Sequence, residues 1–322
     1  MAPSALAQTE NGNHATPGEA RRGADLIYLV DASVYIFRAY YSELPAMTDR
    51  DGNAAHAVFG FARFLCDLME AVRPSHIAVA FDQRLTSSFR NRIYPAYKAN
   101  REPPPPGLEL QFQRCREFCR HLGVAAFISP EYEADDIIGT LAAIMRRAGV
   151  CSVLITRDKD LAQLVRDGDH YWDYGHRERF GYEQIEKRFG VIPERFADYL
   201  ALTGDSVDNI RGVPGVGPKT AAALMKEFAS LEDLYAGLER VARLNLRGAS
   251  GLPARLLLHR EAAFLARRLT MIACDMPLEV DVGSLRRRPP DARALTSFYD
   301  HHGFGPLLRR QSDRLAQMLC SA

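Results

Sequence analysis

The 322-residue chain is long enough to bury a large core, and its 47% hydrophobic and 25% charged residues are typical of a globular protein. A formal net charge of +1 excludes a uniformly basic coat, and no apolar stretch is long enough to cross a membrane, so no membrane partner is expected. The six cysteines lack a zinc-type spacing, and there is no secretory signal, which favours reduced thiols and a cytoplasmic location.

Residues 1–24 are small and polar without periodicity, which predicts a disordered tail. Three apolar runs follow, DLIYLVD, HIAVAFD and CSVLI, and each ends at or shortly before an aspartate. Helical spacing of apolar residues over 57–72, 108–123 and 134–149 separates these runs. Continuous apolar strands alternating with helices predict an α/β fold, with a parallel sheet covered on both faces.

The balanced total charge conceals segments of opposite sign. Residues 84–101 (RLTSSFRNRIYPAYKANR) carry five basic side chains and no acid, and residues 240–270 carry seven arginines and one glutamate. Residues 131–136 (EYEADD) hold four carboxylates. This pattern is expected of a protein that binds phosphates and holds metal ions nearby, although a solvated helix face explains the second basic segment equally well.

The aspartates after the strands define a candidate metal site. Ligands of open α/β sheets bind beyond the carboxyl ends of the strands, and Asp31, Asp82, Asp158 and Asp160 lie at that edge. The segment EYEADD can begin a helix at the same edge, where an acidic start alone is usually a cap favoured by the helix dipole. So many carboxylates together require a positive charge among them, and oxygen ligands suit hard divalent cations.

A second motif spans ADYLALTGDSVDNIRGVPGVGPKTAAALMKEF at residues 197–228. It predicts a helix, a loop, a GVPGVG hairpin and a further helix that begins at Pro218 or Lys219. Gly215 and Gly217 allow a close backbone approach, and the free N–H groups of the second helix can bind an anion. Such a helix–hairpin–helix holds nucleic-acid phosphates without reading the bases.

With these motifs in order, the chain resembles the 5′-nuclease domain of bacterial DNA polymerase I and the wider flap endonuclease family. The matching stretches are VDASVYIFRAYY, FDQRLTSSFRNRIYPAYKANR, YEADDIIGTLA, TRDKDLAQLV and LTGDSVDNIRGVPGVGPKTA, and the likeness runs from about residue 25 to 310. We accordingly expect a PIN-like nuclease core over 25–200 with a helical arch at about 84–110. A helical subdomain over 201–310, with the helix–hairpin–helix at about 198–228, and a C-terminal tail over 311–322 should follow.

The resemblance also implies site residues. Two neighbouring metal sites are expected, one from Asp31, Asp82, Glu133, Asp135 and Asp136 and the other from Asp158, Asp160, Asp205 and Asp208. Glu131 should face solvent. Lys98 and Arg90 are the expected catalytic contacts to the scissile phosphate. The expected DNA-binding residues are Arg92, Tyr94, Tyr97, Arg101, Gly215, Gly217, Lys219 and Thr220, although both tyrosines fit a core position as well.

The implied activity is hydrolysis of DNA phosphodiester bonds at 5′ ends and 5′ flaps by two Mg²⁺ ions, with Mn²⁺ as a substitute. Primer removal and repair both fit this activity, with an RNA-primed 5′ end as a further substrate, a DNA polymerase as a candidate partner, and K⁺ as a candidate ligand of the hairpin. No polymerase segment follows the motifs, as expected of a standalone nuclease, although a fragment fits equally well.

Two rival functions are weighed against this one. A PIN-like ribonuclease would share the strand-end acids but would not need the hairpin or the basic segment. A non-catalytic junction-binding protein would be marked by lost carboxylates, and all nine are present. Its one support is Arg157, which stands where relatives usually carry a small residue and would either pair with a ligand carboxylate or point into solvent.

Overall fold

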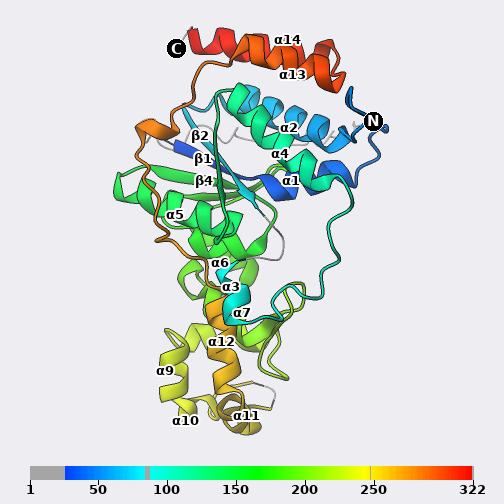
Figure 1. Ribbon diagram of the computed structural model, residues 1–322. Helices are drawn as coiled ribbons and strands as arrows, with labels where there is room; N and C mark the ends of the chain where they lie inside the picture. Colours follow the sequence, from blue (N-terminus) through cyan, green and yellow to red (C-terminus); the bar gives the residue numbers. More distant parts are fainter. Residues whose placement is uncertain (1–25, 84–87, 247, 321–322) are drawn as a thin grey trace, which may run out of the picture.

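A six-stranded sheet forms the centre of the protein in the computed structural model, which describes residues 26–83, 88–246 and 248–320 (Figure 1). The expected disordered tail over 1–24 lies outside the described residues. The strand order is β3-β2-β1-β4-β5-β6, with β6 antiparallel at one edge and the others parallel. The strands are β1 Leu26–Asp31, β2 His76–Asp82, β3 Ala125–Ser129, β4 Cys151–Ile155, β5 His170–Asp173 and β6 Glu178–Phe180. The predicted α/β fold with a mainly parallel sheet is confirmed.

Helices cover both faces of this sheet. One face packs against α1 Ala32–Tyr40, α2 His56–Val72 and α4 Leu108–His121, and the other against α5 Ala134–Arg147. Successive side chains of a strand point to opposite faces, so Leu29 joins the core under α5 while Val30 joins the core under α2. The three helices expected over 57–72, 108–123 and 134–149 are confirmed as α2, α4 and α5. Cys115 and Cys119 are buried free thiols on α4.

A lobe built mainly of helices extends below the sheet (Figure 1). Its helices are α6 Tyr182–Phe189, α7 Phe196–Thr203, α8 Pro218–Glu227, α9 Leu231–Ala236, α10 Leu238–Val241, α11 Leu252–Leu258 and α12 Arg260–Thr270. The strands β7 Gly204–Asp205 and β8 Ile210–Arg211 pair between α7 and α8. Short 3₁₀ helices are η1 Lys159–Leu164, η2 Pro193–Arg195, η3 Ala249–Gly251 and η4 Gly283–Leu285. The helix expected after the hairpin begins at Pro218, one of the two predicted positions.

The segment over the strand ends is less helical than expected. Within the described residues 88–107 one helix forms, α3 Phe89–Ile93, and the chain then runs in turns and coil to α4 (Figure 1). The prolines of YPAY and EPPPP explain this, because proline lacks the donor that a helix interior needs. A backbone hydrogen bond from Lys98 N to Asp208 O (3.0 Å) fastens this segment to the loop before α8, and so does a side-chain hydrogen bond from Asn209 Nδ2 to Ala96 O (2.7 Å).

The end of the chain returns to the sheet domain. From α12 it passes alongside α5 to α13 Ala292–His302 and α14 Pro306–Cys320, and α14 packs on α2 (Figure 1). Leu308 and Leu315, two helical turns apart, are fully buried, and Gln311 Nε2 donates to Asp67 Oδ1 at 2.6 Å. The expectation of a helical subdomain up to 310 followed by a tail over 311–322 is therefore wrong for 292–320. The seven-residue spacing of Leu308 and Leu315 in the sequence is typical of a helix with one buried face.

This packing makes a direct stability prediction. Leu308→Ala should lower the free energy of unfolding by about 2–5 kcal/mol, because a fully buried leucine leaves a cavity behind. The adjacent Leu307, which is 42% exposed, provides a matched control, and Leu307→Ala should change stability little. Urea unfolding followed by circular dichroism measures both. Equal effects of the two variants would show that α14 does not pack as described.

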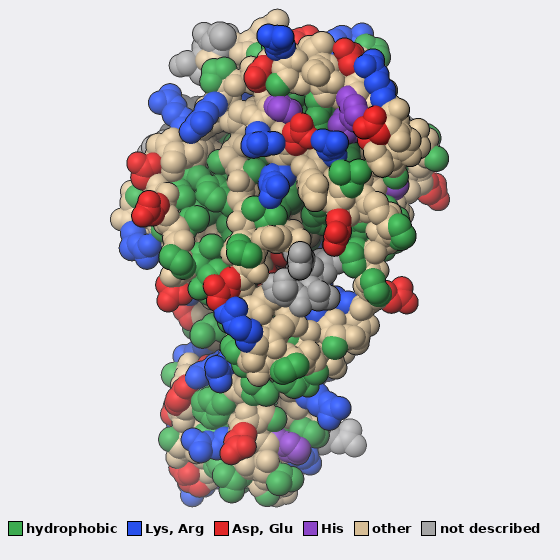
Figure 2. Space-filling model, viewed as in Figure 1, with side chains coloured by type: hydrophobic (Ala, Val, Ile, Leu, Met, Phe, Trp, Pro, Cys, Tyr) green, Lys and Arg blue, Asp and Glu red, His purple; other side chains and the backbone are tan. Residues whose placement is uncertain are grey.

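Charged side chains of both signs are interspersed over the visible face of the body and of the lower lobe (Figure 2). Many of the basic side chains are paired, as Arg267 is with Glu232 at 2.6 Å and Arg240 is with Asp233 at 2.8 Å. Part of the basic segment 240–270 is thus a solvated, paired surface. Among the described helices, none combines the length and apolarity needed to cross a bilayer.

Candidate active site

The candidate site lies where three neighbouring strands end. Strand connections run in opposite directions from the boundary between β1 and β4, which is the position where α/β sheets bind ligands. Asp82 ends β2, with Oδ1 accepting from Ala134 N (2.8 Å) and Oδ2 from Ser33 Oγ (2.6 Å). Asp31 ends β1, and its Oδ2 accepts from Thr156 Oγ1 at 3.0 Å. These bonds hold two carboxylates in place at adjacent strand ends.

Four aspartates interact electrostatically at this edge. Burial, and then the charges of Asp82 and Asp158, raise the pKa of Asp31 to about 7. The pKa of Asp135, on the first turn of α5, is raised well above its usual value by desolvation, then by Asp158, Asp31 and Asp82. A carboxylate whose pKa is raised in this way has too little positive charge nearby to stabilise its ionised form.

A second group of carboxylates adjoins the first. Burial, and then the charge of Asp158, raises the pKa of Asp160 to about 8, and its Oδ1 is buried without a hydrogen-bond partner. Lys159 Nζ lies 2.6 Å from Asp205 Oδ2 and 3.6 Å from Asp160 Oδ1. Asp208 accepts from Arg101. The charge of Asp158 raises the pKa of members of both groups, Asp31 and Asp160.

Lys98 connects the two groups. Its Nζ lies 2.9 Å from Glu133 Oε1 and 3.8 Å from Asp208 Oδ2, and its side chain is 14% exposed. The backbone of Lys98 has φ +57°, a conformation that costs energy for a residue with a Cβ. Tertiary contacts therefore hold this cation against a local backbone preference, which is common where a side chain serves a site.

The structure contradicts the expected roles of Arg90 and Asp136. The Asp136 carboxylate is fully buried and binds the Arg90 guanidinium at 2.7 and 2.8 Å. Arg90, 2% exposed, also donates to Leu269 O and Met271 O. Asp136 Oδ2 further accepts from the N–H of Glu133, the N-cap of α5. Asp136 therefore caps the helix instead of facing an ion, and Arg90 is out of reach of a phosphate.

The expected DNA contact of Tyr97 is also corrected. Tyr97 is 3% exposed, and its hydroxyl donates to Glu133 Oε2 at 3.0 Å and to Asp208 Oδ2 at 3.2 Å. Its ring therefore cannot stack on a base in this structure, and Tyr94 packs against the same core. Arg92 is 67% exposed and pairs with Glu131, which confirms that Glu131 faces solvent.

The hairpin between α7 and α8 presents its backbone at the surface. Gly215 has φ +76° and is exposed, and a Cβ there would meet the guanidinium of Arg255 at 2.6 Å. Gly217 and Lys219 are exposed, and Thr220 is half-buried. The first N–H groups of α8 are thus accessible to an anion.

Several residues near the carboxylates were not foreseen. Ser33 and Thr156 orient Asp82 and Asp31, and Lys159 neutralises Asp205. Their position in the sequence could have indicated this role, because each lies within two residues of a predicted ligand; Lys159, for example, lies between Asp158 and Asp160. The side chain of Arg157 is 44% exposed and lies 3.3 Å from Asp173 Oδ2, outside the predicted ligand set.

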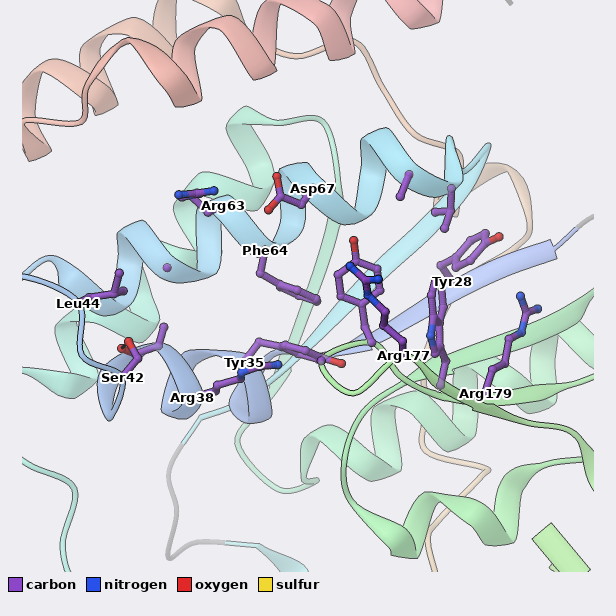
Figure 3. Close-up of a pocket in the computed structure, with 17 residues that line it drawn as sticks. Tyr28, Tyr35, Arg38, Ser42, Leu44, Arg63, Phe64, Asp67, Arg177 and Arg179 are labelled. Atoms are coloured by element: carbon purple, nitrogen blue, oxygen red, sulfur yellow. Dashed lines mark hydrogen bonds between the residues drawn. The ribbon is translucent and has the colours of Figure 1, made fainter. Parts of the chain in front are cut away.

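A cavity of about 1040 Å³ lies beside α1, α2 and the β5–β6 turn (Figure 3). The rings of Tyr35 and Phe64 stack there at 3.7 Å, and Arg38, Arg63, Arg177 and Arg179 also line it. None of its lining residues belongs to the predicted site. A second cavity, of about 470 Å³, is lined by Asp82 and therefore adjoins the carboxylate site.

The donor set fits divalent cations. The oxygens of these carboxylates are hard ligands, which divalent cations prefer. A bound cation would also stabilise the ionised forms of Asp31 and Asp160, whose pKa values are raised, and would give the Oδ1 of Asp160, which has no hydrogen bond, a partner. Among the described residues, no three carboxylates of this cluster bring oxygens within 4.8 Å of one another. Lys98 and Lys159 supply part of the compensation in this arrangement.

The raised pKa values predict how stability depends on pH without metal. Since Asp31 and Asp160 have pKa values of about 7 and 8 in the folded protein, against 3.8 ordinarily, the folded state binds more protons than the unfolded chain. Stability in a chelator should therefore fall as pH rises from 5 to 9, and Mg²⁺ should restore it most at pH 9. Thermal melts at fixed ionic strength measure this. Equal melting temperatures with and without Mg²⁺ at pH 9 would contradict it.

Comparison with known proteins gives consistent matches over nearly the whole described chain. Residues 26–190 match the family model "5′-3′ exonuclease, N-terminal resolvase-like domain", and residues 191–293 match "5′-3′ exonuclease, C-terminal SAM fold". A DNA polymerase I of Pseudomonas aeruginosa is 40% identical over 274 residues, which are 85% of this chain and 30% of that protein. A 5′-3′ exonuclease of Buchnera aphidicola is 33% identical over 276 residues, 86% of this chain and 91% of that protein.

Solved structures show the same fold. T5 D15 protein co-crystallised with metal ions superposes with a TM-score of 0.62 at 19% identity, covering 91% of this chain and 99% of that one. The catalytic core of Rad2 in complex with DNA substrate superposes with a TM-score of 0.57 at 18% identity, covering 92% of each chain. The chain spans about 30% of the length of the polymerase relative and nearly all of the exonuclease relative.

Proposed function

The chain belongs to the 5′-3′ exonuclease family, and from that premise we propose that it is a structure-specific nuclease that hydrolyses DNA at 5′ ends and 5′ flaps with two divalent ions. The observation that carries the proposal is the gathering of carboxylates and Lys98 at adjacent strand ends. An RNA-primed 5′ end fits the same chemistry, because nothing at the carboxylates selects a sugar. Primer removal and flap repair, with a DNA polymerase as partner, are the roles we infer.

Charge balance supports two ions. Nine carboxylates of the predicted set meet four cations, Arg90, Lys98, Arg101 and Lys159, so five negative charges are uncompensated before protonation. Two divalent cations would supply four positive charges. We assign Asp31, Asp82 and Asp135 to one ion and Asp160, Asp205 and Asp208 to the other, with Asp158 between them. Mg²⁺ is the expected ion and Mn²⁺ a substitute, since both prefer carboxylate oxygens.

Bound divalent ions lower the pKa of a coordinated water and stabilise both oxygens of an in-line displacement at phosphorus. The protein's own part is to place charge. We assign Lys98 to the scissile phosphate, because it lies between both carboxylate groups with its side chain only 14% exposed, where a charge interacts strongly. Arg101 and the exposed Arg92 would bind adjacent backbone phosphates.

The hairpin would hold the duplex part of the substrate. The exposed N–H groups at the start of α8, with Gly215, Gly217, Lys219 and Thr220, are assigned to one strand's phosphates. These contacts carry no base sequence, so substrate choice would depend on junction shape. We extend the proposal to K⁺ at the hairpin, where backbone carbonyls are the available ligands. A solved Rad2 core in complex with DNA substrate, which shares the fold, supports DNA as the ligand.

Cleavage of an end-labelled 5′-flap duplex tests the proposed function, with a blunt duplex and an RNA-flap duplex alongside. Products near the flap base that require Mg²⁺ support the proposal. Tight binding without cleavage in Mg²⁺ or Mn²⁺ would favour the junction-binding protein. Cleavage of the RNA strand alone would favour the ribonuclease.

Lys98→Ala should lower the rate of flap cleavage by about a hundredfold, roughly 3 kcal/mol, if the ammonium stabilises charge at the phosphate. Single-turnover kinetics at saturating enzyme separate this loss from weaker binding. Lys187 on α6, whose side chain is 76% exposed, provides the matched control, and Lys187→Ala should cleave normally. An unchanged single-turnover rate for Lys98→Ala would remove Lys98 from the catalytic set.

A further inference from the structure

A second group of potential metal ligands lies where the loop between α1 and α2 meets the end of α13. Asp49, His301 and His302 each offer one ligand atom, and the three atoms lie within 4.8 Å of one another. Among the described residues, no other group of three His, Cys, Asp or Glu side chains meets this distance. Asp49 and His302 are buried, at 7% and 3% exposed. None of the three belongs to the predicted nuclease site.

The side chain of His302 has the hydrogen bonding and the burial that are typical of a metal ligand. Its Nδ1 lies 2.8 Å from Phe298 O, and because a carbonyl only accepts, the proton sits on Nδ1. Nε2 therefore carries a lone pair, and it is buried without a hydrogen-bond partner. Burial lowers the pKa of His302, which favours the neutral form of the ring. Metal-bound histidines show this arrangement, in which one ring N–H donates to a carbonyl and the other nitrogen binds the ion.

The other two ligands are also held in place. His301 Nε2 lies 3.4 Å from Asp49 Oδ2 and 3.7 Å from Asp51 Oδ2, without hydrogen-bond alignment to either. The Asp49 carboxylate accepts from Asn53 N at 2.8 Å and from Asp51 N at 3.0 Å, which fixes its orientation. Arg50 N donates to His301 O at 2.9 Å, so the loop is fastened to the end of the helix.

We propose that Asp49, His301 and His302 form a site for a transition-metal cation of the zinc class, with Asp51 or water as a further ligand. Two imidazole nitrogens and a carboxylate suit Zn²⁺ and disfavour Mg²⁺, which binds oxygen ligands. The carboxyl end of a helix such as α13 favours a cation. A cavity of about 530 Å³, lined by Arg50, Thr296 and His301 among others, gives access from solvent.

The ion would join two distant parts of the chain. The loop that carries Asp49 connects α1, whose N-cap is Asp31, to α2, while α13 precedes the helix that packs on α2. A bound ion would therefore tie the C-terminal helices to the loop that follows the candidate active-site strand. The competing explanation is a pairing of His301 with Asp49 and Asp51, which needs no metal.

Co²⁺ binding to the full-length protein tests the proposal. A four-coordinate site gives Co²⁺ strong visible absorption, whereas a six-coordinate site of carboxylates and water, of the kind that Mg²⁺ prefers, gives weak absorption. Wild type and Asp135→Asn should both show the strong bands, and Zn²⁺ should displace them. His301→Ala and His302→Gln should lose the bands and bind Zn²⁺ about a hundredfold more weakly or worse, since even outer-sphere partners change affinity 10- to 100-fold.

His259→Gln, in the lower lobe, is the matched control and should retain the bands. His301 has a side chain 31% exposed, so His301→Ala keeps the test decisive if the buried His302→Gln does not fold. Weak absorption in wild type, or equal Zn²⁺ affinity in wild type and His301→Ala, overturns the proposal and leaves the pairing of His301 with Asp49 and Asp51. The nuclease assay is not the readout, so this outcome is independent of the proposed function.

Discussion

Replacing Asp135 with asparagine is expected to lower Mg²⁺-dependent cleavage of a 5′-flap duplex by about a hundredfold to a thousandfold, a loss of roughly 3–4 kcal/mol of transition-state stabilisation. Asparagine keeps the shape of the side chain but removes the charge that would bind the ion. Asp135 is the appropriate position because burial, and then the charges of Asp158, Asp31 and Asp82, raise its pKa. Single-turnover cleavage over a Mg²⁺ titration measures the effect.

The same substitution should make the metal-free protein more stable. A carboxylate whose pKa is raised by burial and like charges opposes folding when it ionises, so its removal is favourable at pH 8 in a chelator. Urea unfolding should therefore show a higher midpoint for Asp135→Asn than for wild type. Asp167→Asn, at an exposed position, is the control for a lost carboxylate elsewhere. Normal cleavage combined with lower stability would contradict the metal-site assignment.

Asp136→Asn is expected to have the opposite effect on stability, although the two aspartates are adjacent. Removing the Asp136 charge leaves the buried Arg90 guanidinium with only the longer contact to Glu133 Oε2, at 3.3 Å, as a carboxylate partner, and this should lower the free energy of unfolding by about 3–5 kcal/mol. Urea unfolding at pH 8 in a chelator measures the loss. It should be independent of Mg²⁺ if Asp136 is no ligand.

A double variant tests the cause. Arg90→Met with Asp136→Leu removes both charges, and it should recover much of the stability that either change alone loses, because no buried charge is left uncompensated. Unchanged stability with cleavage abolished in Asp136→Asn would return Asp136 to the metal ligands. If Asp136 is not a ligand, the activity that Asp136→Asn loses should be proportional to the fraction of that protein that is unfolded.

Residues that belong to one local element were predictable from the sequence. The strand-end positions of Asp31 and Asp82 follow from apolar runs that end in an aspartate, and helix α8 begins at Pro218 because proline fits a first turn. The neighbouring strand ends also followed, since parallel strands bring their carboxyl ends to one edge. Local periodicity and backbone preference are sufficient for these features.

The sequence also has a helical period of apolar residues near its C-terminal end, where no packed helix was expected. Leu308 and Leu315 lie seven residues apart, the spacing of one buried helical face, within a segment that was expected to be a tail. The partner that buries them, α2, lies far away in the sequence. The pattern predicts that such a helix packs somewhere, but it does not state against which surface.

Only the tertiary structure decided which of the clustered carboxylates are paired with a basic side chain and which are available to bind an ion. Asp135 and Asp136 are neighbours in a helix, so they point about 100° apart, and only packing determines that the second meets Arg90, 46 residues away. Packing likewise buries Tyr97 between Glu133 and Asp208, and it brings Asp49 to His301. Sequence spacing determines the side of an element on which a residue lies. Burial and partners depend on how distant elements meet, and this decides whether a charge is a ligand or half of an ion pair.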